Sequence, residues 1–163
     1  MSAVLFVAQE EIIEVGHKQI GQLKQAAMEA PLKRSRICLH QDHSDQVQEM
    51  VIAFCKDSYI RPHRHLKKSE SFHVIEGSLS VVFFDDNGEI TRRVEMSSQG
   101  SRQTFIYRLS SSLWHTVVPR SEFVILHETT TGPFIKGDTE FPSWAPEDGD
   151  TQGVSALLAR IAP

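Results

Sequence analysis

A short stretch of the chain holds two histidines, a glutamate and a glycine at spacings that suit metal chemistry. His63 and His65 are separated by one residue. Side chains two residues apart lie on the same face of a β-strand, so these imidazoles can converge on one ion. Glu70 follows after four residues, enough for a turn to bring its carboxylate in from the next strand, and Gly77 is placed to close a tight turn. This pattern predicts a metal-binding site.

The elements that must position these residues are short strands. Segments rich in apolar residues alternate with turn signals and predict strands over 47–55, 71–76, 79–84, 90–95, 104–109, 114–118 and 123–128. Asn87-Gly88, between two of these segments, is a strong hairpin signal. Strands spaced by roughly ten residues are typical of a sandwich or barrel, not of a parallel sheet with crossover helices.

The ends of the chain have a different pattern. Apolar residues recur near the helical period over 9–29, which predicts a helix that Pro31 ends. The basic residues 32–36 are expected to connect it to a short strand over 37–40. Residues 132–149, rich in proline and aromatic side chains, are expected to form an irregular wrap, and 154–161 a short helix. We therefore expect a single domain made of a helix and lead-in strand over 1–45, a β-barrel over 46–131 and a C-terminal wrap over 132–163.

Composition excludes several classes of protein. The 163 residues are 40% hydrophobic and 23% charged, which excludes a disordered chain, a collagen-like repeat and a coiled coil. A net charge of −4 would repel phosphate backbones, so no nucleic-acid partner is expected. The apolar run over 3–8 is too short to span a membrane and follows no basic segment, so we expect no membrane partner, no secretory signal and a cytoplasmic location. Cys38 and Cys55 are expected as free buried thiols, with one disulfide as the alternative.

The spacing His-x-His, four residues, Glu, six residues, Gly resembles the first motif of the cupin family, and the chain matches it at every fixed position. The resemblance implies one more histidine from a later strand, and His115 stands in that place. Here the second motif departs from the family pattern, which has proline and glycine where this chain has Ser110 and Ser112, and asparagine where it has Pro119. The resemblance implies His115 as a ligand and leaves the turn before it open.

Longer segments, at 59–65, 70–77, 82–86, 114–119 and 141–147, resemble the WbuC group of cupin-fold metalloproteins over roughly residues 10–150. This resemblance implies an all-β fold, a cupin-type jelly-roll β-barrel with an N-terminal α-helix and an irregular C-terminal extension. It also implies a homodimer joined through sheet edges. Members of the group occur among genes of polysaccharide (O-antigen) biosynthesis and have no assigned reaction, so the resemblance implies a fold and a metal but not a reaction.

The implied ligands are three imidazoles and one carboxylate, from His63, His65, Glu70 and His115. Nitrogen and oxygen donors without thiolate suit one divalent transition metal, and iron, zinc, manganese, nickel and cobalt fit about equally. Four protein ligands leave two positions of a six-coordinate ion for water or substrate, as catalysis requires. The alternative is that His63 and His65 are ordinary residues of an edge strand.

Two arginines are candidates for binding a substrate. Arg61 has the same strand parity as His63 and His65, and a guanidinium there would hold a carboxylate or phosphate group. Arg108, shortly before the strand of His115, is the second candidate, with a surface strand position as its alternative. Tyr107 has the opposite parity and is expected to pack in the core. Other basic residues, Arg64, Lys67 and Lys68, are expected in a solvated loop.

These features support two functional hypotheses. The first is a metal-dependent enzyme, isomerase-like or oxygenase-like, that acts on a small anionic or sugar-derived substrate linked to surface polysaccharide biosynthesis. The second is a non-catalytic module that uses the metal to anchor a small molecule. The sequence leaves open which of the two holds, and with it whether the protein is an enzyme.

Overall fold

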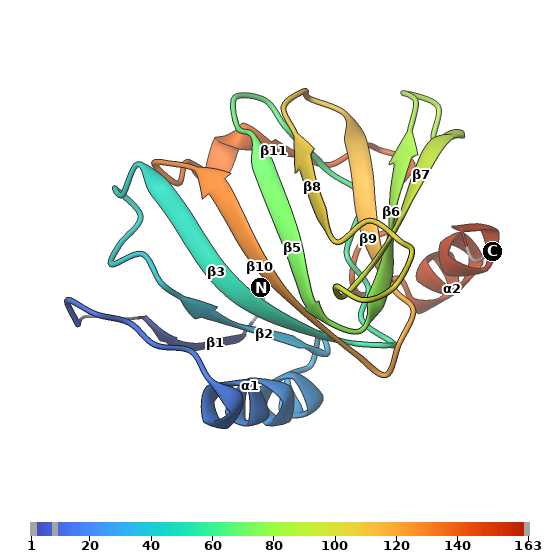
Figure 1. The fold of residues 1–163 in the computed structure, drawn as a ribbon. Helices are drawn as coiled ribbons and strands as arrows, with labels where there is room; N and C mark the ends of the chain where they lie inside the picture. Colours follow the sequence, from blue (N-terminus) through green and yellow to red (C-terminus); the bar gives the residue numbers. More distant parts are fainter. Residues whose placement is uncertain (1–2, 8–9, 162–163) are drawn as a thin grey trace.

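A computed structural model of the chain, which describes residues 3–7 and 10–161, contains two facing β-sheets with a helix at each end (Figure 1). The main sheet has six strands in the order β1 (Ala3–Val7), β2 (Arg34–Cys38), β3 (Val47–Cys55), β10 (Phe123–Thr131), β5 (Glu70–Glu76) and β8 (Ile106–Leu109). The facing sheet has the order β7 (Ile90–Ser97), β6 (Ser78–Phe84) and β9 (Trp114–Pro119). A third sheet pairs β11 (Thr139–Glu140) with β4 (Arg64–His65).

The core lies between the two larger sheets because each strand alternates its side chains between two faces. On β3, the inward side chains of Met50, Ile52 and Phe54 meet Val81 and Val117 of the facing sheet. The opposite face of β3 packs against helix α1 (His17–Glu29), which lies beneath the β1–β2–β3 side in Figure 1. Apolar contacts therefore hold the main sheet on both of its faces.

The C-terminal segment runs over the open side of the sandwich. It contains the short helix η1 (Lys136–Asp138), β11 and helix α2 (Thr151–Ile161). Trp144 packs against Phe84 with ring centroids 5.1 Å apart, and the Tyr59 hydroxyl donates a 2.8 Å hydrogen bond to the Pro146 carbonyl. Because β11 pairs with β4, this wrap fixes the strand that bears His65.

The β-rich architecture confirms the expected fold class, and the predicted strands over 47–131 are present with ends shifted by up to three residues. Among the residues described, the strands form separate facing sheets, and no closed barrel is found. One expectation about the helices was wrong. Helix α1 begins at His17, not at residue 9, which itself lies outside the described residues, as do 1–2, 8 and 162–163. Gly16 is extended and caps the helix, and Ile12 before it is 77% exposed.

Strand β2 also differs from the expectation. It spans Arg34–Cys38, so the basic stretch expected to be a connector forms most of the strand. Ser35 is fully buried and donates a 2.7 Å hydrogen bond to the Leu23 carbonyl of α1. Since neighbouring residues of a strand face opposite ways, Arg34 and Arg36 point away from the helix, toward the interior of the sandwich.

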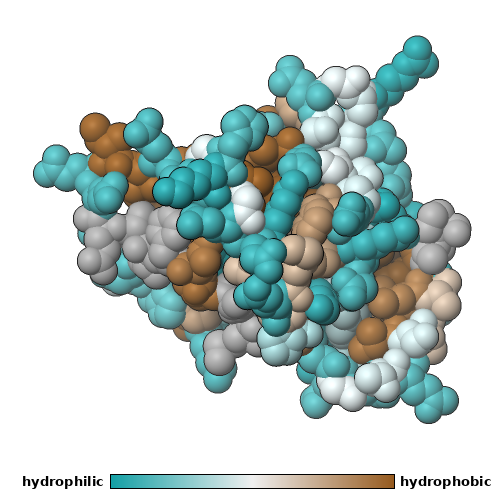
Figure 2. All heavy atoms as spheres, turned by 90° about the horizontal axis from the view of Figure 1, so that it is seen from below, coloured by the Kyte–Doolittle hydropathy of each residue, from teal (hydrophilic) through white to brown (hydrophobic). Residues whose placement is uncertain are grey.

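The surface polarity and the state of the two cysteines are as expected from the composition. The face seen from below is largely hydrophilic, with apolar residues in separate areas (Figure 2). Cys38 and Cys55 are buried free thiols, as expected. Within the described part of the chain, no helix has the length and apolarity to cross a membrane.

Candidate metal centre

Three of the predicted ligands meet in one cluster. The metal-binding nitrogens of His63, His65 and His115 all lie within 4.8 Å of one another. His63 and His115 are held opposite each other by two backbone hydrogen bonds of 2.9 and 3.0 Å, and His65 is fixed by the pairing of β4 with β11. The departures in the second motif, at Ser110 and Ser112, thus do not prevent the β8–β9 loop from delivering His115.

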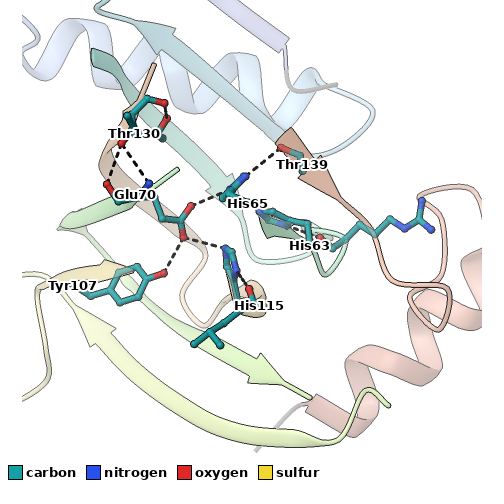
Figure 3. A network of polar contacts seen from close by, with 11 residues as sticks. His63, His65, Glu70, Tyr107, His115, Thr130 and Thr139 are labelled. Atoms are coloured by element: carbon teal, nitrogen blue, oxygen red, sulfur yellow. Dashed lines mark hydrogen bonds and ion pairs between the residues drawn. The ribbon is translucent and has the colours of Figure 1, made fainter. Parts of the chain in front are cut away.

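Hydrogen bonds to the imidazoles orient each ring (Figure 3). Nδ1 of His63 lies 2.8 Å from the Arg61 carbonyl, and Nδ1 of His115 lies 2.8 Å from the Leu113 carbonyl. Nδ1 of His65 lies 3.2 Å from the Thr139 hydroxyl. A carbonyl only accepts, so Nδ1 of His63 and of His115 carries the proton and Nε2 keeps its lone pair for a ligand.

Glu70, the first residue of β5, completes the cluster. It is 2% exposed, and its two carboxylate oxygens lie 3.3 Å from Nε2 of His65 and 3.0 Å from Nε2 of His115. The Tyr107 hydroxyl donates a 2.8 Å hydrogen bond to the same carboxylate. Burial by itself would raise the pKa of Glu70, but the contacts with His115 and His65 outweigh it and hold the pKa well below its usual value.

The histidines differ in their electrostatic surroundings. Burial, together with the neighbouring His115, lowers the pKa of His63 to about 3, so this ring stays neutral at physiological pH. For His115, burial lowers the pKa, but the adjacent Glu70 carboxylate outweighs burial and the net shift is upward. The cluster therefore combines a neutral donor with a carboxylate that is ionised.

The donor set fits a divalent metal ion. Metal–donor distances of about 2.0–2.2 Å allow two donors on one ion to lie up to roughly 4.4 Å apart, so the three imidazoles need only a small rotation to share an ion. Nε2 of His115 is buried and has no well-aligned hydrogen-bond donor or acceptor, which leaves it available as a ligand. With thiolates absent from this cluster, the donors suit a divalent first-row transition metal.

The two arginine candidates occupy different places. Arg61 lines a pocket of about 670 Å³ together with His63 and His65. Its guanidinium lies 4.9 Å from the Phe141 ring centroid. Arg108 is exposed and donates hydrogen bonds to Ser69 and Ser71, so the structure does not bring it into this pocket.

Three features of the site escaped sequence reasoning. The ring of Tyr107 packs against Phe72 as expected, but its hydroxyl reaches Glu70. Arg34 and Arg36 line the same pocket as Arg61, since β2 begins earlier than expected. Glu128 on β10 points inward opposite Met50, and burial followed by the charge of Glu70 raises its pKa to about 8. Strict alternation along β10 from the apolar residues Val124 and Leu126 would have identified Glu128.

A family model matches residues 15–96, a span that includes the whole motif from His63 to Gly77; the family is described as a domain of unknown function (DUF6016). The chain belongs to this family. No curated protein matches the chain. The family description assigns no activity, so the functional argument for this DUF6016 protein rests on its own site.

Solved structures show which fold this DUF6016 protein shares. Salicylate 1,2-dioxygenase from Pseudoaminobacter salicylatoxidans, in complex with gentisate, matches with a TM-score of 0.57 and 14% identity over 79% of this chain and 37% of that one. Oxalate oxidase in complex with glycolate matches with a TM-score of 0.53 and 13% identity over 69% of this chain and 57% of that one. The capsular polysaccharide assembling protein CapF from Staphylococcus aureus matches with a TM-score of 0.51 and 17% identity over 67% of this chain and 31% of that one. At these identities the likeness shows the fold alone, a jelly roll of the cupin type, and the chain spans only part of each neighbour.

Proposed function

We propose that this protein is a metal-dependent enzyme that acts on a small anionic, sugar-derived molecule. In this proposal His63, His65, Glu70 and His115 hold one divalent transition metal. The observation that carries it is the convergence of three oriented imidazoles beside an open pocket of about 670 Å³. A structural metal site would be closed, whereas this cluster adjoins space for a small molecule.

The side chains around the cluster have separable tasks. A divalent ion bound there supplies Lewis-acid chemistry or, if it is iron, oxygen chemistry. The backbone carbonyls of Arg61 and Leu113 hold the rings of His63 and His115 in the ligating tautomer. Tyr107 fixes the Glu70 carboxylate, and Arg61, stacked near Phe141, orients the anionic part of the substrate in the pocket.

The finer assignment is that the protein is of the WbuC type and works in surface polysaccharide biosynthesis as a homodimer. The resemblance of the motif segments supports the first part. The printed name of the fold neighbour CapF, a capsular polysaccharide assembling protein, is compatible with the second. Apolar side chains exposed on and beside the edge strand β8, Phe105 at 39% and Ile106 at 56%, support pairing through this edge of the main sheet.

Turnover assays test the proposal. Purified protein loaded with iron, manganese, nickel or zinc is incubated with keto- and aldo-sugar phosphates while isomerised product and dioxygen consumption are followed. We expect turnover with at least one metal, abolished in His63→Ala and retained in the control Arg92→Gln, whose side chain is exposed on β7. Tight binding of a sugar phosphate without conversion by any metal form would contradict an enzyme and support the non-catalytic binding module.

A further inference from the structure

The pocket beside the metal cluster has a cationic wall. Three arginines, Arg34, Arg36 and Arg61, line it together with His63 and His65. In a chain with a net charge of −4, a concentration of guanidinium groups in one cavity is not explained by overall composition. The clustering of Arg34, Arg36 and Arg61 at this pocket therefore calls for an explanation in the pocket itself.

Two of these arginines occupy inward positions of β2, where apolar side chains are usual. Arg34 and Arg36 pair in register with Phe54 and Ile52 of β3, which belong to the core between the sheets. The next inward residue of β2, Cys38, is buried in that core. Two inward residues of one strand lie about 6.6 Å apart, so both guanidinium groups can reach a single ligand. Burying charged groups at such positions costs stability unless they are paired.

The structure leaves donors of all three arginines unpaired. The Nε atoms of Arg34, Arg36 and Arg61 are buried and have no hydrogen-bond partner. Elsewhere on these side chains, Nη1 of Arg34 donates to the Tyr59 carbonyl at 3.1 Å, and Nη1 of Arg36 lies 3.7 Å from the Met50 sulfur. These guanidinium groups thus keep free hydrogen-bonding capacity beside the cavity.

Acidic residues at the pocket neutralise the wall only in part. Glu147 and Asp148 also line the pocket, but both are exposed. The contact of Arg61 with Glu147 is 3.6 Å, and the Glu147 side chain is 80% exposed, so solvent screens this ion pair. Three partly buried guanidinium groups and two exposed carboxylates therefore line the pocket, and the excess charge among these five groups is positive.

We propose that Arg34, Arg36 and Arg61 bind a phosphoryl group of the substrate. A carboxylate has two oxygens, which a single guanidinium fork satisfies, whereas a phosphate monoester offers three terminal oxygens and up to two negative charges. Arginine suits such planar, multidentate recognition of phosphate better than lysine. The assignment rests on the proposed function because it takes this pocket to be the substrate site of the metal centre. It narrows the substrate class from an anionic molecule to a phosphorylated one.

The test measures anion binding by isothermal titration calorimetry on chelator-treated protein, so that no anion can bind through a metal. Inorganic phosphate and pyrophosphate are the probes, with acetate and malonate as carboxylate controls. We expect saturable binding of phosphate or pyrophosphate, weakened about tenfold or more by each of Arg34→Gln, Arg36→Gln and Arg61→Gln. Arg36→Lys, which keeps the charge but loses the fork, should fall between Arg36→Gln and wild type. The control Arg92→Gln should stay within about twofold of wild type.

The possible outcomes separate this inference from the proposed function. Phosphate binding that is absent in wild type, unchanged in all three variants or matched by malonate would overturn the phosphoryl site. Thermal unfolding of each variant identifies any that fail to fold. If Arg34→Gln or Arg36→Gln fails to fold, phosphate binding by Arg36→Lys tests the contribution of the β2 arginines instead. Metal content of the same variants is measured separately, on protein that has not been treated with chelator. If the protein binds metal but not phosphate, the metal centre is supported and the phosphoryl site is refuted. If it binds phosphate but takes up no metal, the phosphoryl site is supported and the metal centre is refuted.

Discussion

The interior of the sandwich has an apolar half and a polar half. The same strands contribute inward side chains to both. In the apolar half, the inward positions of β5, β9 and β10 hold Val74, Val117 and Val124. In the polar half, inward positions of the same three strands hold Glu70, His115 and Glu128. Backbone geometry and side-chain direction are the same in both halves. The difference shows that residue type along a strand, and not a change of fold, separates the part that stabilises this protein from the part that can do chemistry.

The two halves also differ in how well their groups are satisfied. Side chains of the apolar half, such as Leu126, are fully buried and need no partners beyond their packing. The polar half buries a carboxylate against two imidazoles and leaves arginine and histidine nitrogens without partners. Buried polar groups without partners reduce stability, so a site of this composition indicates a ligand that satisfies them. The following predictions test this contrast.

The largest effect is expected from truncation in the apolar half. Leu126→Ala removes a side chain with no exposed surface and should lower the free energy of unfolding by about 2–5 kcal/mol. The control Leu113→Ala removes a side chain that is 47% exposed and should change it by less than about 0.5 kcal/mol. Urea unfolding of chelator-treated protein measures both. Equal effects of the two substitutions would show that the assigned core does not provide the stability.

A change in the polar half should act on metal affinity instead. Tyr107→Phe keeps the ring packed against Phe72 but removes the hydroxyl that orients Glu70. Loss of such a hydrogen bond to a ligand should weaken metal binding about 10- to 100-fold with a small change in unfolding. The control Tyr59→Phe removes a hydroxyl that bonds the Pro146 carbonyl outside the cluster and should leave metal affinity unchanged. Competition with a metal indicator measures the affinities, and equal losses would contradict a role for Tyr107 in holding Glu70.

The smallest effect concerns the inward carboxyl of Glu128. Its pKa is raised from 4.5 to about 8 in the folded protein, so between these values the unfolded chain has released a proton that the folded chain retains. The contribution of Glu128 to the stability of the metal-free protein should therefore fall as pH rises from 5 to 8, whereas the lowered pKa of His63 acts in the opposite direction below about pH 6.5. The stability of wild type relative to Glu128→Gln should therefore be greater at pH 5 than at pH 8. Unfolding free energies at pH 5 and pH 8 give the comparison, with Glu122→Gln, at an exposed position before β10, as the control. A difference between wild type and Glu128→Gln that is the same at both pH values would refute the assignment.

The contrast between the halves also explains what the sequence could predict. Apolar segments between turn signals located the strands, and the spacing from His63 to Gly77 located the first ligands. The resemblance to the second cupin motif added His115, which lies 45 residues after Glu70 in the chain and joins the histidine cluster. Arg34 and Arg36 were not assigned to a strand, because charged residues at inward positions look like a connector when the ligand that they would face is unknown. The hydroxyl of Tyr107 was missed since parity indicates the side of a sheet but not how far along it a long side chain reaches.

Helix α1 shows the opposite error. Apolar residues such as Ile12 and Ile13 extend the helical period toward residue 9, but a period alone does not supply a surface to pack against. The helix begins after Gly16, whose backbone N–H donates a 3.1 Å hydrogen bond to the Gln19 side chain, and it buries Leu23 and Ala27 on the β2–β3 side of the sheet. The apolar period therefore continues past Gly16, where the cap ends the helix at its N-terminus.

Metal content tests the central claim most directly. Protein purified without an affinity tag is analysed by mass spectrometry for bound metal, with wild type, His63→Ala, Glu70→Ala and the control Arg92→Gln measured side by side. The account predicts close to one transition-metal ion per chain in wild type and in Arg92→Gln, and its loss in both ligand variants. If wild type contains no metal and takes up none on reconstitution, or if His63→Ala and Glu70→Ala keep a full complement, the cluster is not a metal centre.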